Sequence, residues 1–150
     1  MNRARGLSLL ELLVVVALIA TLAGIGAMVI GRAMPGQELR AAARELAAEL
    51  RYTRAQAIAT GAEQVFRLDV DSRRWNAAGK REGALPANIE LVATTARDGQ
   101  PVAREATVRF FPEGAATGGR FVLRRDGAAW RVDVAWLTGE VTLSRGEGRP

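Results

Sequence analysis

The chain has 150 residues, a formal net charge of +5 and 49% hydrophobic residues. This length supports one modest domain beyond the N-terminal segment. Because the sequence contains neither cysteine nor histidine, it excludes disulfides, thiolate chemistry, zinc sites built from these residues and histidine-dependent catalytic triads. Arginine supplies nearly all of the positive charge, and the surplus alone does not indicate a nucleic-acid partner.

A long apolar segment follows a short basic leader at the N-terminus. Arg3 and Arg5 precede an uncharged stretch over residues 12–31, which as a helix is roughly 30 Å long, enough to cross the hydrocarbon core of a bilayer. Three interpretations apply: a cleaved secretory signal, a plain signal anchor, or a prepilin-type leader. The first is disfavoured, because the apolar stretch is about twice as long as the usual signal core.

Glu11, at the head of the apolar stretch, favours the prepilin-type leader. A carboxylate in an apolar helix normally has a partner, and cleavage between Gly6 and Leu7 would place a free amine four residues before it. Residues 6–12 (GLSLLEL) resemble the class III signal of type IV pilins and pseudopilins, although Leu7 stands where the family usually has phenylalanine. The resemblance implies that a prepilin peptidase cleaves after Gly6 and methylates Leu7, and that Glu11 guides insertion of the subunit into a fibre.

Helical periodicity resumes after Pro35, which would bend or interrupt a helix. Over residues 37–60, charged side chains occupy a face that is expected to be solvated. The opposite apolar stripe consists of Leu39, Ala43, Leu46, Leu50, Ala57 and Ile58. Gly61 is well placed to end the helix.

The pattern then changes to the two-residue alternation of β-strands. Strands are predicted at 64–70, around Trp75, and at 89–93, 107–111, 121–125, 130–136 and 140–144. Residues 77–87 are predicted to form a loop and residues 97–101 a turn. Asp126-Gly127 is a strong hairpin signal, and Trp136 is expected to share one strand face with Trp130.

Glycines recur in the C-terminal part of the chain, within residues 111–123 and 132–141. These two segments resemble the signature of the GspH/FimT group of minor pilins and pseudopilins, as does Leu50–Ala57 in the helix, whereas residues 71–105 show little similarity. The motif residues to which we assign a structural role are Pro112, Gly114, Gly118, Gly119, Thr138 and Gly139. From the residues alone, these glycines supply turns and positive backbone angles.

The pattern and the resemblance together predict an α+β, pilin-like fold, with a long N-terminal helix packed against antiparallel sheet. The expected division is a leader over 1–6, a transmembrane and filament-core helix over 7–31, an amphipathic helix over 32–61 and a periplasmic β-rich domain over 62–150. The basic leader predicts a single-pass inner-membrane orientation with the N-terminus in the cytoplasm.

The resemblance implies an H-type minor pseudopilin of the type II secretion system, a structural subunit near the tip of the periplasmic pseudopilus. Its expected partners are the major shaft subunit, the minor tip subunits, the prepilin peptidase and the inner-membrane assembly platform. We expect no enzyme activity, no cofactor and no metal, because the carboxylates lack a histidine or cysteine beside them.

The alternative keeps the fold and assigns a type IV pilus minor pilin of the FimT/FimU kind that binds DNA for uptake. In this alternative, six arginines would contact phosphates: Arg120, Arg124, Arg125, Arg131, Arg145 and Arg149. Acidic residues are interspersed among them, which is more typical of a solvated surface, and nucleic-acid binding is therefore not the favoured interpretation.

Overall fold

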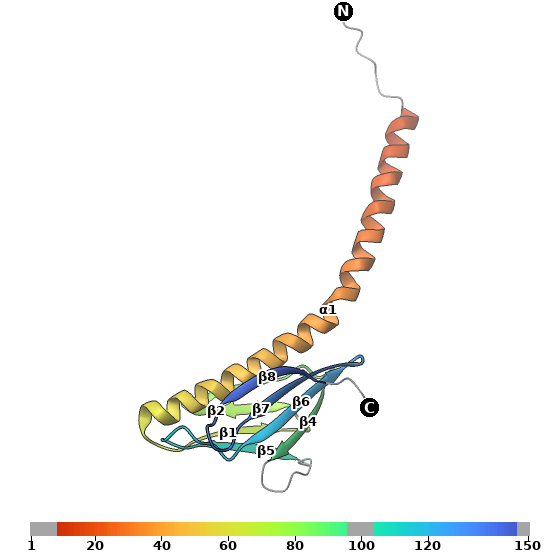
Figure 1. Ribbon diagram of the computed structural model, residues 1–150. Coiled ribbons are helices and arrows are strands. Elements are labelled where there is room, and N and C mark those ends of the chain that lie inside the picture. Colours follow the sequence, from red (N-terminus) through yellow and green to blue (C-terminus); the bar gives the residue numbers. More distant parts are fainter. Residues whose placement is uncertain (1–8, 96–103, 147–150) are drawn as a thin grey trace, which may run out of the picture. The chain divides into compact units, whose positions relative to one another are not determined.

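The computed structural model describes residues 9–95 and 104–146, with the side chains of residues 22–35 and of Thr95 outside the description. One long helix, α1 (Leu9–Thr60), precedes the strands (Figure 1). The strands are β1 (Gln64–Asp69), β2 (Arg74–Ala77), β3 (Arg81–Ala84), β4 (Glu90–Thr95), β5 (Glu105–Phe110), β6 (Gly119–Arg125), β7 (Ala128–Val134) and β8 (Val141–Gly146). The short 3-10 helix η1 (Ala78–Lys80) connects β2 to β3.

The chain divides into two compact units, an N-terminal unit (Met1–Met34) and a globular unit (Pro35–Pro150). The division falls at Pro35, where the sequence predicts a bend or an interruption. α1 includes Pro35, so the helix is not interrupted there. A proline removes one amide donor, and α1 accommodates that loss.

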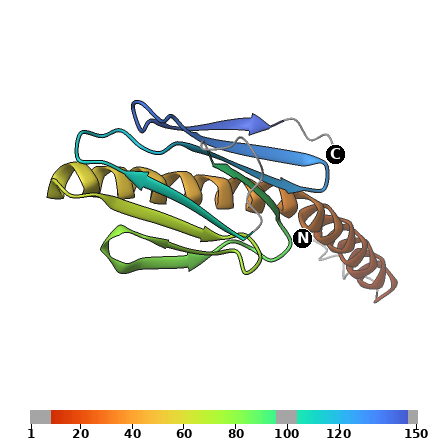
Figure 2. The same ribbon diagram turned by 90° about the horizontal axis from the view of Figure 1, so that it is seen from below.

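Two four-stranded antiparallel sheets form the globular unit. Their strand orders are β3-β2-β1-β5 and β4-β6-β7-β8, and Figures 1 and 2 together show the C-terminal part of the helix lying along the strands of both sheets. All strand pairings are antiparallel, which confirms the predicted α+β class. The single helix supplies the apolar surface on which both sheets close.

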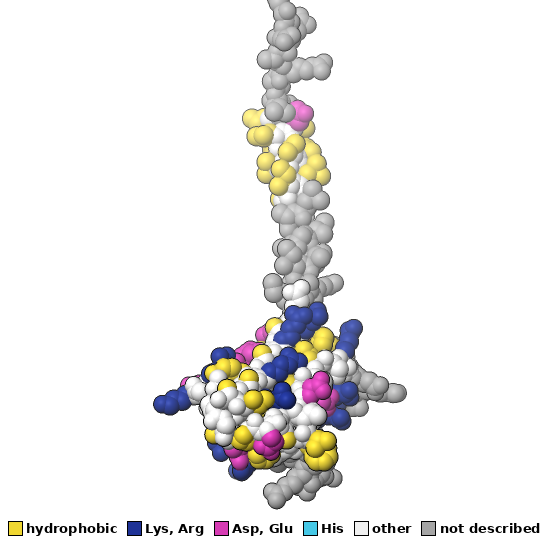
Figure 3. All heavy atoms as spheres, turned by 60° about the vertical axis from the view of Figure 1, so that its left-hand side comes forward, with side chains coloured by type: hydrophobic (Ala, Val, Ile, Leu, Met, Phe, Trp, Pro, Cys, Tyr) yellow, Lys and Arg dark blue, Asp and Glu magenta, His cyan; other side chains and the backbone are white. Residues whose placement is uncertain are grey.

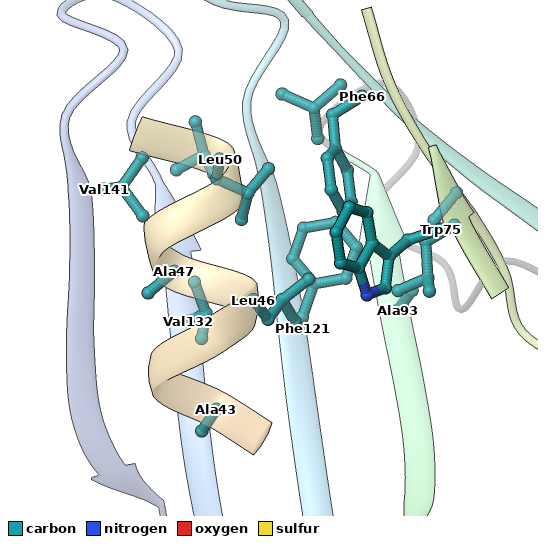
Figure 4. Packing of buried hydrophobic residues seen from close by; sticks show 14 of the residues in the cluster. Ala43, Leu46, Ala47, Leu50, Phe66, Trp75, Ala93, Phe121, Val132 and Val141 are labelled. Atoms are coloured by element: carbon teal, nitrogen blue, oxygen red, sulfur yellow. The ribbon is translucent and has the colours of Figure 1, made fainter. Parts of the chain in front are cut away.

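The helix stripe and the inner faces of the sheets build one hydrophobic core (Figure 4). Leu46 and Leu50 are fully buried, as the three- and four-residue spacing predicts. Phe66 stacks on Trp75 at a centroid distance of 6.2 Å and meets Phe121 edge-on at 6.3 Å. Offset and edge-on contacts of this kind add to the stabilisation that burial gives.

The turn after β6 and the end of α1 both have the backbone conformation that their residues predict. Asp126 and Gly127 have φ values of 50° and 76°, as a type I′ turn between β6 and β7 requires. Gly61, directly after α1, has a φ of 62°, which matches a left-handed helix cap.

The prediction of a loop over residues 77–87 is confirmed for 85–87 and wrong for 77–84. Residues 81–84 form β3, which pairs with β2 in a regular register from Arg74–Ala84 to Ala77–Arg81. Gly83 makes the strand compatible with the core, because a Cβ atom there would overlap the Trp75 ring. The glycine-rich composition therefore reflects close packing against an aromatic side chain rather than a loop. The turn predicted at 97–101 lies outside the described residues.

Candidate assembly site

The leader motif is only partly within the described chain. Gly6 and Leu7 lie outside it, whereas Glu11 is in the first turn of α1 and is exposed. Large aliphatic side chains around it, from Leu9 to Ile19, are 45–79% exposed. Figure 3 shows this hydrophobic surface. An apolar surface of this extent marks a site of interaction with protein or membrane.

Within the described residues, no helix combines the length and the hydropathy needed to cross a membrane. Residues 22–31 of the predicted span lie outside the described side chains.

Near its C-terminal end, α1 is joined to two distant loops by Arg54. Its Nε donates to the carbonyl oxygen of Gly114 at 3.0 Å, and its Nη2 donates to the carbonyl oxygen of Thr138 at 2.9 Å. A charged donor strengthens such hydrogen bonds. We call Arg54, Gly114, Thr138 and Gly139 the Arg54 junction.

Glycine geometry makes the Arg54 junction close-packed. Gly114 and Gly139 have φ values of 90° and 62°, and a Cβ atom on Gly139 would overlap the carbonyl oxygen of Gly114. Gly118 also has a positive φ of 77°, and a Cβ on Gly119 would lie 3.3 Å from Val108 Cγ2. Only glycine adopts such backbone angles at little cost.

The motif loops are further fixed by their own backbone. In the loop between β5 and β6, which contains the exposed Pro112, the Gly114 amide donates to Phe111 and the Phe111 amide donates to Ala115. The Ala116 amide donates to the carbonyl of Trp136, at 2.9 Å, in the loop between β7 and β8. The two glycine-containing loops therefore form one hydrogen-bonded layer with the end of α1.

Two more charged residues of α1 contact the strands, so the predicted solvated face is in part an internal contact surface. Arg51 donates to the carbonyl of Val141 through Nη2 at 2.9 Å and Nε at 3.3 Å. Glu49, only 6% exposed, accepts from Arg81 at 2.9 and 2.5 Å. The hydrogen bond and the charge of Glu49 raise the pKa of Arg81 above its usual value, and the Arg81 guanidinium lies over the Tyr52 ring. The sequence pattern missed these roles, because periodicity assigns charged residues to the solvent.

The arginines of the DNA alternative do not form one surface. Strand alternation places Arg120, Arg124 and Arg131 on the outer face of the β4-β6-β7-β8 sheet. Asp133 forms ion pairs with Arg120 at 2.6 Å and with Arg131 at 2.8 Å. These pairs reduce the charge available to phosphates.

The remaining three arginines lie elsewhere. Arg125 forms ion pairs with Glu38 and Asp126, and Arg145 lies opposite Trp130 in the β7–β8 register. Arg149 is outside the described residues. Within the described chain, no cluster of three or more acidic side chains could hold a metal ion.

One long helix, with an exposed apolar N-terminal part headed by a carboxylate and a C-terminal part packed on antiparallel sheets, is the architecture of a pilin-like protein. Residues 42–139 match the family model of the type II transport protein GspH, and residues 1–30 match the prokaryotic N-terminal methylation motif. The chain belongs to the GspH family of type II transport proteins.

Individual relatives agree with this assignment. The chain is 49% identical, over 93% of its length and 83% of the relative, to the type II secretion system protein H of Xanthomonas campestris pv. campestris. The minor pseudopilin EpsH of Vibrio cholerae has a similar fold, with a TM-score of 0.57 and 19% identity over 72% of this chain and 97% of that one. The type IV minor pilin FimU of Pseudomonas aeruginosa also has a TM-score of 0.57, with 16% identity over 72% and 89% of the two chains.

These findings confirm the predicted family and the predicted function, that of an H-type minor pseudopilin of the type II secretion system. The FimT/FimU alternative has less support. Its structural representative shares the fold at low identity, whereas the relative at 49% identity is a secretion protein.

Proposed function

We propose that this subunit is cleaved between Gly6 and Leu7, methylated on Leu7, and moved from the inner membrane into the tip region of the periplasmic pseudopilus. It acts there as a structural element rather than as an enzyme, next to the major shaft subunit and the minor tip subunits. The observation that carries this proposal is the exposed apolar surface of α1 with Glu11 in its first turn.

Glu11 makes the contact that sets the register of the N-terminal helix against its neighbours in the filament. Its side chain takes part in no ion pair among the described residues, and a carboxylate surrounded by apolar helices is costly without a partner. The free amine created by cleavage, on this subunit or its neighbour, satisfies that carboxylate in a low-dielectric helix bundle. Aliphatic contacts hold the bundle and the ion pair sets its register.

The proposed topology is a single pass, with the basic leader in the cytoplasm and the globular unit in the periplasm. Arg3 and Arg5 support this orientation through the positive-inside rule. The prepilin peptidase and the inner-membrane assembly platform are the partners expected before incorporation.

The test is a Glu11→Val variant in secreting cells that lack the native copy. We expect normal membrane insertion and cleavage, measured by fractionation and by the size of the protein, but loss of most incorporation into sheared or crosslinked pseudopili. A Gly6→Val control should block cleavage and leave a slightly larger protein in the membrane. Normal incorporation of the Glu11→Val subunit would refute the pairing.

A further inference from the structure

The loop between β7 and β8 presents two large apolar side chains to solvent. Trp136 is 67% exposed and Leu137 is 66% exposed. Among the described side chains of the globular unit, Ile58 is the only other large hydrophobic one with comparable exposure, at 48%. Exposed tryptophan and leucine side by side are unusual on a surface that has no partner.

This exposure contradicts the sequence pattern. Alternation predicts that Trp136 shares one strand face with Trp130 and Val132, but β7 ends at Val134. The chain then turns, because the Gly139 amide donates to Ala135 at 2.8 Å. The turn moves Trp136 out of the strand and away from the core.

The backbone beneath these two side chains is fixed. The Trp136 carbonyl accepts from the Ala116 amide, and the Ala135 amide donates to the Glu140 carbonyl, both at 2.9 Å. Arg54 holds the Thr138 carbonyl. A rigid loop binds without a large ordering cost, and tryptophan is enriched among residues that dominate binding energy.

Ile58 belongs to the same end of the globular unit. Its Cδ1 atom lies 3.4 Å from the position of a Cβ on Gly114, whose carbonyl is held by Arg54. Figures 1 and 2 both show the end of α1, the β5–β6 loop and the β7–β8 loop at one end of this unit. We call Ile58, Trp136 and Leu137 the Trp136 patch.

The two loops at this end of the unit each carry one acidic side chain. Glu113 and Glu140 are exposed, and neither belongs to an ion pair among the described residues. A complementary surface therefore has an apolar hollow bordered by lysine or arginine. Two copies related by a two-fold axis would instead bring these carboxylates together, which is unfavourable.

We propose that the Trp136 patch docks into a basic-rimmed apolar hollow on a different pilin-type subunit of the same filament. This inference rests on the proposed function, since it names the contact through which the globular unit joins its neighbour. Trp136 and Leu137 enter the hollow, while Glu113 and Glu140 meet its rim and fix the orientation.

Site-specific photo-crosslinking in secreting cells tests the contact. A full-length chain with p-benzoylphenylalanine in place of Trp136 should crosslink to another pilin-type subunit, identified by mass spectrometry. The same probe in place of Asp71, an exposed turn residue after β1, is the matched control and should give little of this product. Glu140→Lys should reduce the Trp136 crosslink several-fold. Crosslinking only between copies of this chain, or none, would overturn the proposal.

A secretion assay separates this inference from the proposed function. The Trp136→Ala/Leu137→Ala double variant should be inserted and cleaved normally, with an unchanged melting temperature of the full chain in detergent. It should lower secretion about tenfold or more, as the loss of a binding hot spot does. If deletion of the chain abolishes secretion and the double variant restores it fully, the inference alone fails. If deletion has no effect, the proposed function fails.

Discussion

The two ends of α1 carry similar aliphatic residues but differ in what covers them. From Leu9 to Ile19 the large side chains are 45–79% exposed, whereas Leu39, Leu46 and Leu50 are fully buried. In the globular unit the same chain supplies the covering surface, as two sheets. In the N-terminal unit the covering surface must come from another molecule, because exposed aliphatic surface of this extent is unfavourable in water. One half of the helix therefore serves folding, and the proposed function assigns the other half to assembly.

The largest expected effect is a difference in how the two halves of α1 respond to a leucine-to-alanine substitution. The free energy of unfolding should fall strongly for a buried leucine of the globular unit and hardly change for an exposed one of the N-terminal unit. Leu46→Ala removes fully buried methyl groups and leaves a cavity, so we expect a loss of about 2–5 kcal/mol in the free energy of unfolding of the globular unit. Leu13→Ala should change that free energy by less than about 0.5 kcal/mol. Since all three tryptophans lie in the globular unit, denaturation of the full chain in detergent can be followed by tryptophan fluorescence. Equal destabilisation by both variants would contradict the division of roles.

A glycine pair sharpens the comparison within the globular unit. Gly139→Ala forces a positive φ on alanine and overlaps the Gly114 carbonyl, so we expect destabilisation of about 1–3 kcal/mol. Gly36→Ala is the matched control, because it lies in α1 with nothing within 4 Å of the new Cβ. That substitution should stabilise the protein by about 0.5–1 kcal/mol. Loss of stability in the Gly36 variant would show that glycine is required there for another reason.

The smallest expected effect is a pH dependence confined to the globular unit. Hydrogen bonds from Ser72, led by its amide at 2.7 Å, lower the pKa of Asp69 below its ordinary 3.8. Because the pKa is lowered on folding, ionised Asp69 stabilises the fold fully at pH values above its ordinary pKa of 3.8. This stabilisation is lost as the pH falls through the lower pKa of the folded state.

Asp69→Asn should therefore lower the melting temperature slightly at pH 7, and this difference should shrink below about pH 4. Melting curves of both proteins at pH 7 and pH 3 measure it. A difference that grows towards acid would contradict the assigned hydrogen bond.

Local signals predicted much of the fold. The helical stripe around Leu46, the alternation in β1 and the Asp126-Gly127 turn each depend on residues close in sequence, and each is present. The leader motif identified the superfamily for the same reason, since its residues are adjacent in the chain.

Long-range features were not predictable in this way. β3 depends on Gly83 meeting the Trp75 ring, and the exposure of Trp136 depends on a turn stabilised by a loop twenty residues away. Glu49 can be buried because Arg81, 32 residues later, donates hydrogen bonds to its carboxylate and neutralises its charge. Periodicity records which face a residue occupies within its own element, but it holds no information about a partner elsewhere in the chain.

The hydrogen bonds of Arg54 and Arg51 join the end of α1 to parts of the chain that are made much later. The acceptors of Arg54 lie 60 and 84 residues later in the chain, and the Val141 acceptor of Arg51 lies 90 residues later. Contacts of such separation slow folding more than they lower stability. In the proposed topology, these contacts at the end of the helix therefore form only after the last hairpin has crossed the membrane.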